Sequence, residues 1–133
     1  MKDLKLMFFL FFISFNLNSQ NINENLIGVW SFKSNLSKNH FILSKEDSLT
    51  IKNIGYQFLE NKKLIVRHFV NTRICMMSDL RFKNYKKGSW KIENDILSIT
   101  WLKNKNNIKE KWIIYNCSRE ELEIKIIDYQ IKN

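Results

Sequence analysis

The sequence predicts an all-β protein, an antiparallel up-and-down meander closed into a β-barrel of about eight strands, after a cleaved N-terminal signal peptide. Three observations lead to this prediction. Beyond residue 25, apolar and polar residues alternate with a period of two, which is typical of half-buried strands. Aromatic and β-branched residues dominate, and the 133 residues include no proline. An open meander of this length would expose two strand edges, whereas a closed barrel exposes none.

The N-terminal segment has the layout of a secretory signal peptide. Lys2 and Lys5 are followed by the apolar run "LMFFLFFISF" and then by the polar stretch "NLNSQN". About ten apolar residues are too few for a helix that spans a bilayer. We therefore expect residues 1–19 to be a signal peptide and residues 20–133 to be one barrel domain, periplasmic or extracellular and not membrane-spanning after cleavage. An uncleaved anchor or a buried N-terminal helix is the alternative.

Short polar links separate the expected strands. The pattern predicts strands at 26–33, 40–44, 48–52, 55–60, 64–71, 90–93, 97–101, 109–117 and 122–128. Asn94 and Asp95 predict a tight hairpin turn, "NK" at 61–62 another turn, and "KNKNN" at 103–107 a polar loop. We expect the first and last strands of this series to pair and close the barrel.

Two of the three glycines stand two residues before a tryptophan, in "GVW" at 28–30 and "GSW" at 88–90. A glycine in a strand often marks a close approach of another chain segment. We expect Gly28 to allow such an approach beside the ring of Trp30. Gly88 is expected to start a hairpin strand whose Trp90 lies in the core.

These stretches resemble a known family. "LIGVWSF" behind a signal peptide is similar to the G-x-W opening strand of lipocalins. The run "YQFLENKKLIVRH", the later "GSWKIENDILSITW" and the final "LEIKI" resemble the small exported lipocalin-like proteins of bacteria. The resemblance covers residues 26–127 and implies a calycin-type barrel that binds a small apolar or amphipathic molecule. It also implies a late basic residue packed across Trp30, for which Arg119 and Lys125 are the candidates.

Aromatic residues of the expected strands are the candidate ligand-binding residues: Trp30, Phe41, Tyr56, Phe58, Trp101 and Trp112. The same rings could instead fill the barrel. A second functional hypothesis is an exported protein-interaction module, such as a hydrolase inhibitor that acts through the loop 72–80. A third is an electrostatic binder of anionic glycan or lipid, since the formal net charge is +9.

No catalytic or metal-binding motif stands out. His40 and His68 fall on expected strands, where we interpret them as structural, and the sequence contains no phosphate-binding loop, nucleophile elbow or zinc motif. We expect a non-catalytic protein without metal or cofactor. The lysines are scattered, so we expect no nucleic-acid partner, and we expect a monomer. Cys75 and Cys117 could form a disulfide in an oxidising compartment or remain two free thiols.

Overall fold

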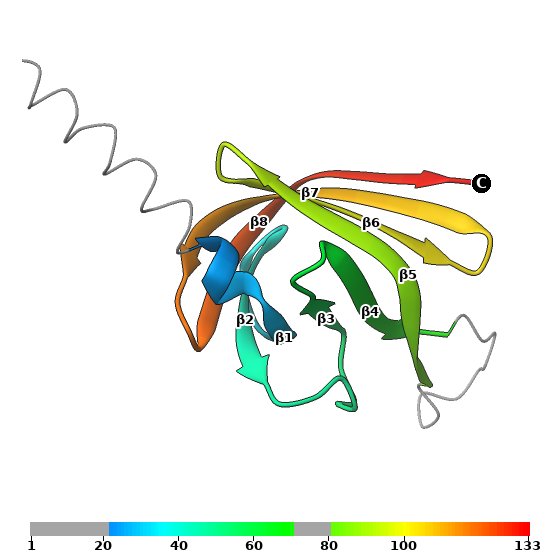
Figure 1. The fold of residues 1–133 in the computed structure, drawn as a ribbon, viewed down its shortest axis with the longest axis horizontal. Coiled ribbons are helices and arrows are strands. Elements are labelled where there is room, and N and C mark those ends of the chain that lie inside the picture. Colours follow the sequence, from blue (N-terminus) through cyan, green and yellow to red (C-terminus); the bar gives the residue numbers. More distant parts are fainter. Residues whose placement is uncertain (1–21, 71–80) are drawn as a thin grey trace, which may run out of the picture.

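The structure, a computed structural model, describes residues 22–70 and 81–133 and forms an eight-stranded antiparallel barrel. The strands are β1 (Gly28–Ser37), β2 (His40–Glu46), β3 (Gly55–Phe58), β4 (Lys63–Phe69), β5 (Phe82–Glu93), β6 (Ile96–Lys103), β7 (Asn106–Cys117) and β8 (Glu121–Lys132) (Figure 1). The predicted all-β barrel is therefore confirmed. The predicted signal peptide and the loop 72–80 lie outside the described residues. Within the described ranges, no helix has the length and apolarity of a transmembrane span.

The strand order around the barrel is β1-β2-β8-β7-β6-β5-β4-β3, and β3 pairs with β1 to complete the ring. Strands β3 to β8 form an up-and-down meander in which each pairs with its neighbours in sequence. The β1–β2 hairpin is inserted between the two ends of this meander. The expectation that the first and last strands pair was therefore wrong in detail, because β2 pairs with β8 while β1 lies between β2 and β3.

The link between β2 and β3 follows from this order, because the chain must pass over β1 to reach its other side. Residues 47–54 form this crossing, so the strand expected at 48–52 is wrong. Arg67 Nε donates to the carbonyl of Ile51 (2.6 Å) and Asn84 Nδ2 to that of Leu49 (3.3 Å). Arg67 and Asn84 are next to inward-facing residues of β4 and β5, so their own side chains point outward. The link that they bind therefore lies on the outside of the barrel.

Two-residue turns join β5 to β6 and β6 to β7. Asn94 and Asp95 have φ values of 52° and 62° and connect β5 to β6, as the sequence predicts. Two successive left-handed residues match the twist of a hairpin, and Asn and Asp tolerate this conformation. The polar loop expected at 103–107 is instead a turn at 104–105, where Asn104 has a φ of 58°. Strands β6 and β7 are accordingly longer than their apolar residues alone suggest.

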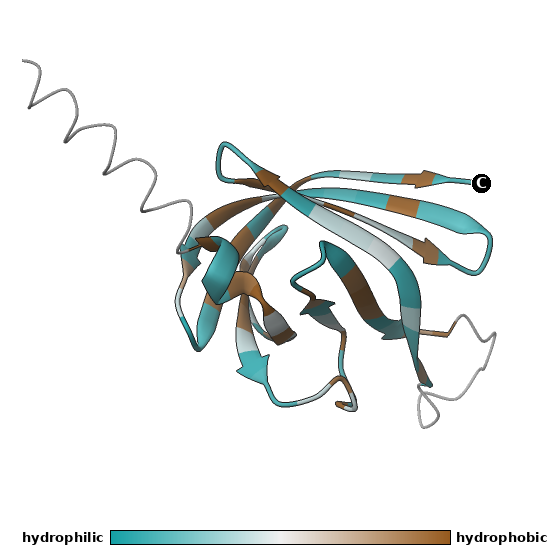
Figure 2. Cartoon of the chain, viewed as in Figure 1, coloured by the Kyte–Doolittle hydropathy of each residue, from teal (hydrophilic) through white to brown (hydrophobic). Residues whose placement is uncertain are grey.

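Hydrophobic and hydrophilic residues alternate along the strands (Figure 2). The buried apolar side chains form one core cluster. The largest fully buried side chains are Trp30, Trp101, Trp112 and Phe58. Rings from three strands meet in edge-to-face contacts, with centroids 5.7 Å apart for Phe58 and Trp90 and 4.8 Å apart for Tyr56 and Trp112. Such contacts add about 0.5–1.5 kcal/mol beyond the area that they bury.

A short helix at residues 22–26 lies at one end of the barrel, here called the helix end (Figure 1). Leu26 is fully buried, and its carbonyl accepts a 2.7 Å hydrogen bond from Trp30 Nε1. Lys45 on β2 places Nζ 4.4 Å from the centre of the Trp30 ring and donates to the carbonyl of Ile27 at 2.6 Å. The basic residue across Trp30 is therefore Lys45. The expected candidates, Arg119 and Lys125, are exposed elsewhere.

The two glycines of the G-x-W stretches both allow close approaches. Gly28 has a φ of +129°, and a Cβ there would lie 2.6 Å from Lys45 Nζ. A Cβ at Gly88 would lie 2.6 Å from the carbonyl oxygen of Leu64 and 3.1 Å from that of Thr100, on the two neighbouring strands. Gly28 therefore makes room for the cation over Trp30, and Gly88 for the passage of β5 between β4 and β6.

We predict that Gly28→Ala lowers the free energy of unfolding by about 2–3 kcal/mol, since it combines an unfavourable φ with displacement of Lys45. Urea denaturation followed by far-ultraviolet circular dichroism measures the change. Asn35→Ala, at an exposed position of the same strand, is the control and should stay within about 0.5 kcal/mol of wild type. Equal stability of Gly28→Ala and wild type would show that Lys45 does not require this space.

Candidate functional site

The six candidate ligand-binding residues all face the interior, but they do not form one site. Trp30, Tyr56, Phe58 and Trp112 are part of the close-packed aromatic core. Phe41 is partly buried and reaches this group through Phe32, whose ring centroid is 4.9 Å from that of Phe41. Trp101 belongs to the same core cluster but its ring contacts those of His68 and Tyr85, toward the end of the barrel opposite the helix, which we call the far end. Their role in binding stays a prediction.

The interior also contains a carboxyl group that the sequence interpretation missed. Glu110 on β7 is 5% exposed and faces inward with Ile108, Trp112 and Ile114. Lys109 and Lys111, on either side of it, face outward and are exposed. In the sequence the stretch "KEK" reads as a solvated charged run. The alternation that starts at Trp112 and Ile114 continues back to Glu110 and could have revealed its inward position.

Aromatic groups surround the Glu110 carboxyl. Trp112 Nε1 donates a 2.7 Å hydrogen bond to Glu110 Oε2. Burial raises the pKa of Glu110, and the indole N–H groups of Trp112 and Trp101 lower it in part. Burial, followed by the charge of Glu110, raises the pKa of Tyr56 well above its usual range and also raises that of Tyr129. The carboxyl therefore lies in a poorly hydrated, aromatic environment, where its charge is costly.

Two buried polar atoms of neighbouring rings, the hydroxyl of Tyr85 and Nε1 of Trp101, have no hydrogen-bond partner among the described residues. The rings of Tyr85 and Trp101 contact each other with centroids 5.5 Å apart. The Trp101 indole lies close enough to Glu110 to affect its pKa, but its geometry falls short of a hydrogen bond. An unsatisfied buried donor costs about 1–3 kcal/mol. Two such groups on one wall are therefore unusual in a purely structural core.

Tyr129 of β8 joins this wall because of a β-bulge. The register between β7 and β8 shifts between Lys111 and Trp112, so that Trp112 pairs with Ile126 and Lys111 with Asp128. Ile127 is therefore an extra residue on β8. Beyond it, the odd-numbered residues of β8 face inward instead of the even-numbered ones, so that Tyr129 lies opposite Glu110 on the inner face. Tyr129 is 53% exposed, whereas the other residues around Glu110 are buried. We call Tyr85, Trp101, Glu110, Trp112 and Tyr129 the Glu110 site.

His68 and Lys103 lie next to the Glu110 site toward the far end. Lys103 Nζ is 3.1 Å from His68 Nδ1, and the His68 ring contacts Trp101 at a centroid distance of 5.5 Å. Burial and the nearby Lys103 charge lower the pKa of His68, and burial lowers the pKa of Lys103. A lowered pKa favours the neutral imidazole, which can accept a hydrogen bond from Lys103 Nζ at Nδ1. The pair adds hydrogen-bonding capacity beside Trp101.

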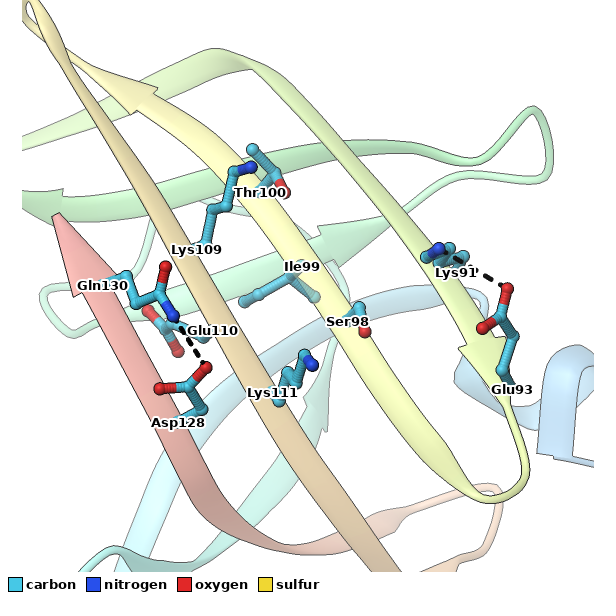
Figure 3. A pocket seen from close by; sticks show the side chains of 10 residues that line it. All are labelled: Lys91, Glu93, Ser98, Ile99, Thr100, Lys109, Glu110, Lys111, Asp128 and Gln130. Carbon is cyan, nitrogen blue, oxygen red and sulfur yellow. Dashed lines mark hydrogen bonds and ion pairs between the residues drawn. The ribbon is translucent and has the colours of Figure 1, made fainter. Parts of the chain in front are cut away.

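A shallow groove of about 370 Å³ lies on the outer face of strands β5 to β8 (Figure 3). Lys91, Lys109 and Lys111 line it together with Glu93 and Asp128. Lys91 is paired with Glu93 at 3.4 Å, and both side chains are largely exposed. Because basic and acidic groups alternate across it, the groove is not the concentrated positive surface that an electrostatic binder of polyanions would need.

The described residues bring together no group with evident catalytic or metal-binding geometry. No set of three His, Cys, Asp or Glu side chains in residues 22–70 and 81–133 could hold a metal ion. His40 Nε2 is 2.8 Å from a carboxylate oxygen of Glu123 across the β2–β8 pair. Each histidine thus forms its side-chain hydrogen bond with a charged residue of another strand, and the His40 ring also contacts the ring of Tyr115.

Cys117 carries a free thiol at the helix end, where burial raises its pKa to about 11. Its Sγ is 4.0 Å from the carbonyl oxygen of Ile22. Cys75 lies outside the described residues, so the disulfide between them stays a prediction. The end of β4 and the start of β5, which flank the segment containing Cys75, lie at the far end of the barrel (Figure 1).

Comparisons of the chain with protein-family models, with curated proteins and with solved structures find no match.

We predict that Glu110→Gln becomes more stable relative to wild type as the pH rises. The pKa of Glu110 is raised in the folded state, so wild-type stability is lost as the pH rises from the unfolded value near 4.5 through the folded value. The amide cannot ionise, so the difference between the two proteins should grow by about 1 kcal/mol or more between pH 4 and pH 7.

Urea denaturation across this pH range tests the prediction, with Glu93→Gln as the control at an exposed side chain. The control should show a difference from wild type that hardly changes with pH. A Glu110→Gln difference that is equally constant would indicate a hydrated carboxyl rather than a buried one.

Proposed function

We propose that the protein is an exported, non-catalytic binding protein that holds a small amphipathic ligand at the Glu110 site, in the manner of a lipocalin. The observation that carries the proposal is the pair of unpartnered buried donors, Tyr85 O–H and Trp101 N–H, on contacting rings of which that of Trp101 lies near the buried carboxyl of Glu110. A ligand atom that accepts from these donors would recover the cost of leaving them unpaired.

The chemistry of the wall defines the polar end of the ligand. Trp101 can only donate, Tyr85 can donate or accept, and an ionised Glu110 can only accept. A hydroxyl or amide group, which both donates and accepts, complements all three. A carboxylate would be repelled by Glu110, which is buried where charges interact strongly. The rings of Trp101, Trp112 and Tyr129 would contact the apolar body of the ligand.

The closed antiparallel barrel and the G-x-W opening strand support the lipocalin-like part of this proposal. The inserted β1–β2 hairpin departs from a barrel in which every strand pairs with its neighbours in sequence. Export is proposed from residues 1–19, with their basic start and apolar run. The loop 72–80 of the alternative hypothesis lies outside the described residues, and no described contact favours that hypothesis.

Isothermal titration calorimetry with 1-decanol, decanamide, decanoate and decylamine tests the proposal, because the four probes share an apolar chain and differ in the polar end. We expect the alcohol and the amide to bind and the carboxylate to bind at least about tenfold more weakly. Binding of decanoate alone would contradict the assignment of the polar end, and absence of binding to all four would contradict the proposed function.

We predict that Tyr85→Phe weakens binding of the alcohol about tenfold, which corresponds to one lost hydrogen bond. The same variant should be as stable as wild type or up to about 1 kcal/mol more stable, because it removes an unsatisfied hydroxyl. Trp101→Phe should also weaken binding, through loss of the N–H group, although its smaller ring makes its stability a less direct measure.

Tyr115→Phe is the matched control, since Tyr115 is 54% exposed on the outer face. It should leave both binding and stability unchanged. If Tyr85→Phe is instead clearly less stable than wild type and binds the alcohol normally, the hydroxyl has a structural role and the proposed site is wrong.

A further inference from the structure

The β2–β8 pair covers only the first part of β8. The ladder runs from the pair Ser44 and Glu121 to the pair His40 and Lys125, and the last contact is a 2.8 Å hydrogen bond from Ile126 N to the carbonyl of Asn39. Beyond this point, residues 127–132 pair with β7 alone among the described residues. Every second residue of this segment therefore directs its N–H and C=O groups toward solvent, which makes a template for another strand.

Exposed apolar side chains gather on the same segment. Ile127, Tyr129 and Ile131 are 46%, 53% and 54% exposed, and they are three of the five large hydrophobic residues that are exposed in the described chain. Tyr129 and Ile131 face the inner side of the sheet, opposite Glu110 and Ile108. A strand added along the free edge of β8 would cover the exposed side of Tyr129 and Ile131.

The outer face of the segment is complementary to itself. Asp128, Gln130 and Lys132 alternate with the inner residues and pair with Lys111, Lys109 and Asn107 of β7. Figure 3 shows Asp128 and Gln130 side by side on this face, joined by a 3.1 Å hydrogen bond. In an antiparallel pair of two β8 strands centred on Gln130, Asp128 of each copy lies opposite Lys132 of the other. Tyr129 then lies opposite Ile131 on the inner face.

We propose that two copies of this chain associate through residues 128–132 of β8, paired antiparallel about a two-fold axis at Gln130. The partner is a second copy because the register matches opposite charges on one face and apolar side chains on the other, as an isologous contact requires. The pairing joins the sheets β6-β7-β8 of the two copies into one. It stops before Ile126, where the β1–β2 hairpin already occupies the edge.

The interface is small, so the dimer is weak. A single added strand buries less area than a standard interface, and interfaces of this size are typically weak. We expect a dissociation constant of about 10 µM or higher. The formal net charge of +9 on each chain opposes association at low ionic strength. The proposed dimer differs from the monomer that the sequence leads us to expect.

Sedimentation velocity of the purified chain tests the proposal at about 150 mM salt, where the screening length is about 8 Å. Asp128→Lys and Lys132→Asp each place like charges opposite each other across the axis, whereas the variant with both changes restores opposite charges. We expect each single variant to raise the dissociation constant at least about tenfold and the double variant to return within about threefold of wild type.

Lys86→Asp is the control, because it makes the same change in net charge as Lys132→Asp at an exposed position of β5. It should leave dimerisation unchanged, and near-ultraviolet circular dichroism checks that every variant is folded. A wild-type chain that stays monomeric up to about 0.5 mM overturns the proposal. Single variants that dimerise normally, or a folded double variant that does not recover, overturn the proposed register and with it the interface.

Discussion

The pairing of β2 with β8 is the constraint on which the rest of the barrel depends. Five residues of each strand form it, and together with the β1–β3 pair it gives every strand two hydrogen-bonded neighbours. Without this seam the sheet would have two long free edges, and water would reach the aromatic core. The 2.8 Å contact between His40 and Glu123 adds a side-chain link on its outer face. The dry interior is thus a consequence of closure as much as of the apolar residues themselves.

In an interior without water, a polar or charged group is costly unless it has a hydrogen-bond partner. Glu110 at a surface would be an ordinary carboxylate, but inside the barrel burial raises its pKa and makes its charge costly. The unpartnered donors of Tyr85 and Trp101 are costly for the same reason. Lys45, in contrast, has partners for its charge, since Nζ donates to the Ile27 carbonyl and lies over the Trp30 ring. The helix end is therefore satisfied internally, and the Glu110 site is the part of the interior that a ligand would complete.

Local patterns in the sequence predicted much of the fold. Alternation and the Asn94–Asp95 turn located the β5–β6 hairpin, because both depend only on neighbouring residues. The closing pairs were not predictable in this way, since they depend on which distant edges meet. The strand expected at 48–52 failed for a related reason. Leu49 and Ile51 alternate with polar residues as in a strand, but in the link they pack on the outside of the barrel, beside Arg67 and Asn84.

The candidate site was less accessible to sequence reasoning than the fold. Aromatic residues identify the interior, but they do not distinguish a ring that fills space from one that lines a site. The polar groups that make this distinction were hidden: Glu110 stands between two lysines, and the bulge that brings Tyr129 to the inner face leaves no local signature. The cation over Trp30 was sought late in the chain, whereas Lys45 reaches it from β2 because β2 is the direct neighbour of β1.

The inserted hairpin also bears on the order in which the chain acquires its structure. Strands β3 to β8 can form one after another through local contacts, but the seam joins residues as far apart as His40 and Glu123, 83 positions along the chain. Such distant contacts lose the most chain entropy and slow folding. The β1–β2 hairpin can therefore join the barrel only after β8 is in place. A sheet with unpaired edges and exposed apolar side chains therefore precedes the finished barrel. Such an intermediate is prone to aggregate and is a substrate for chaperones.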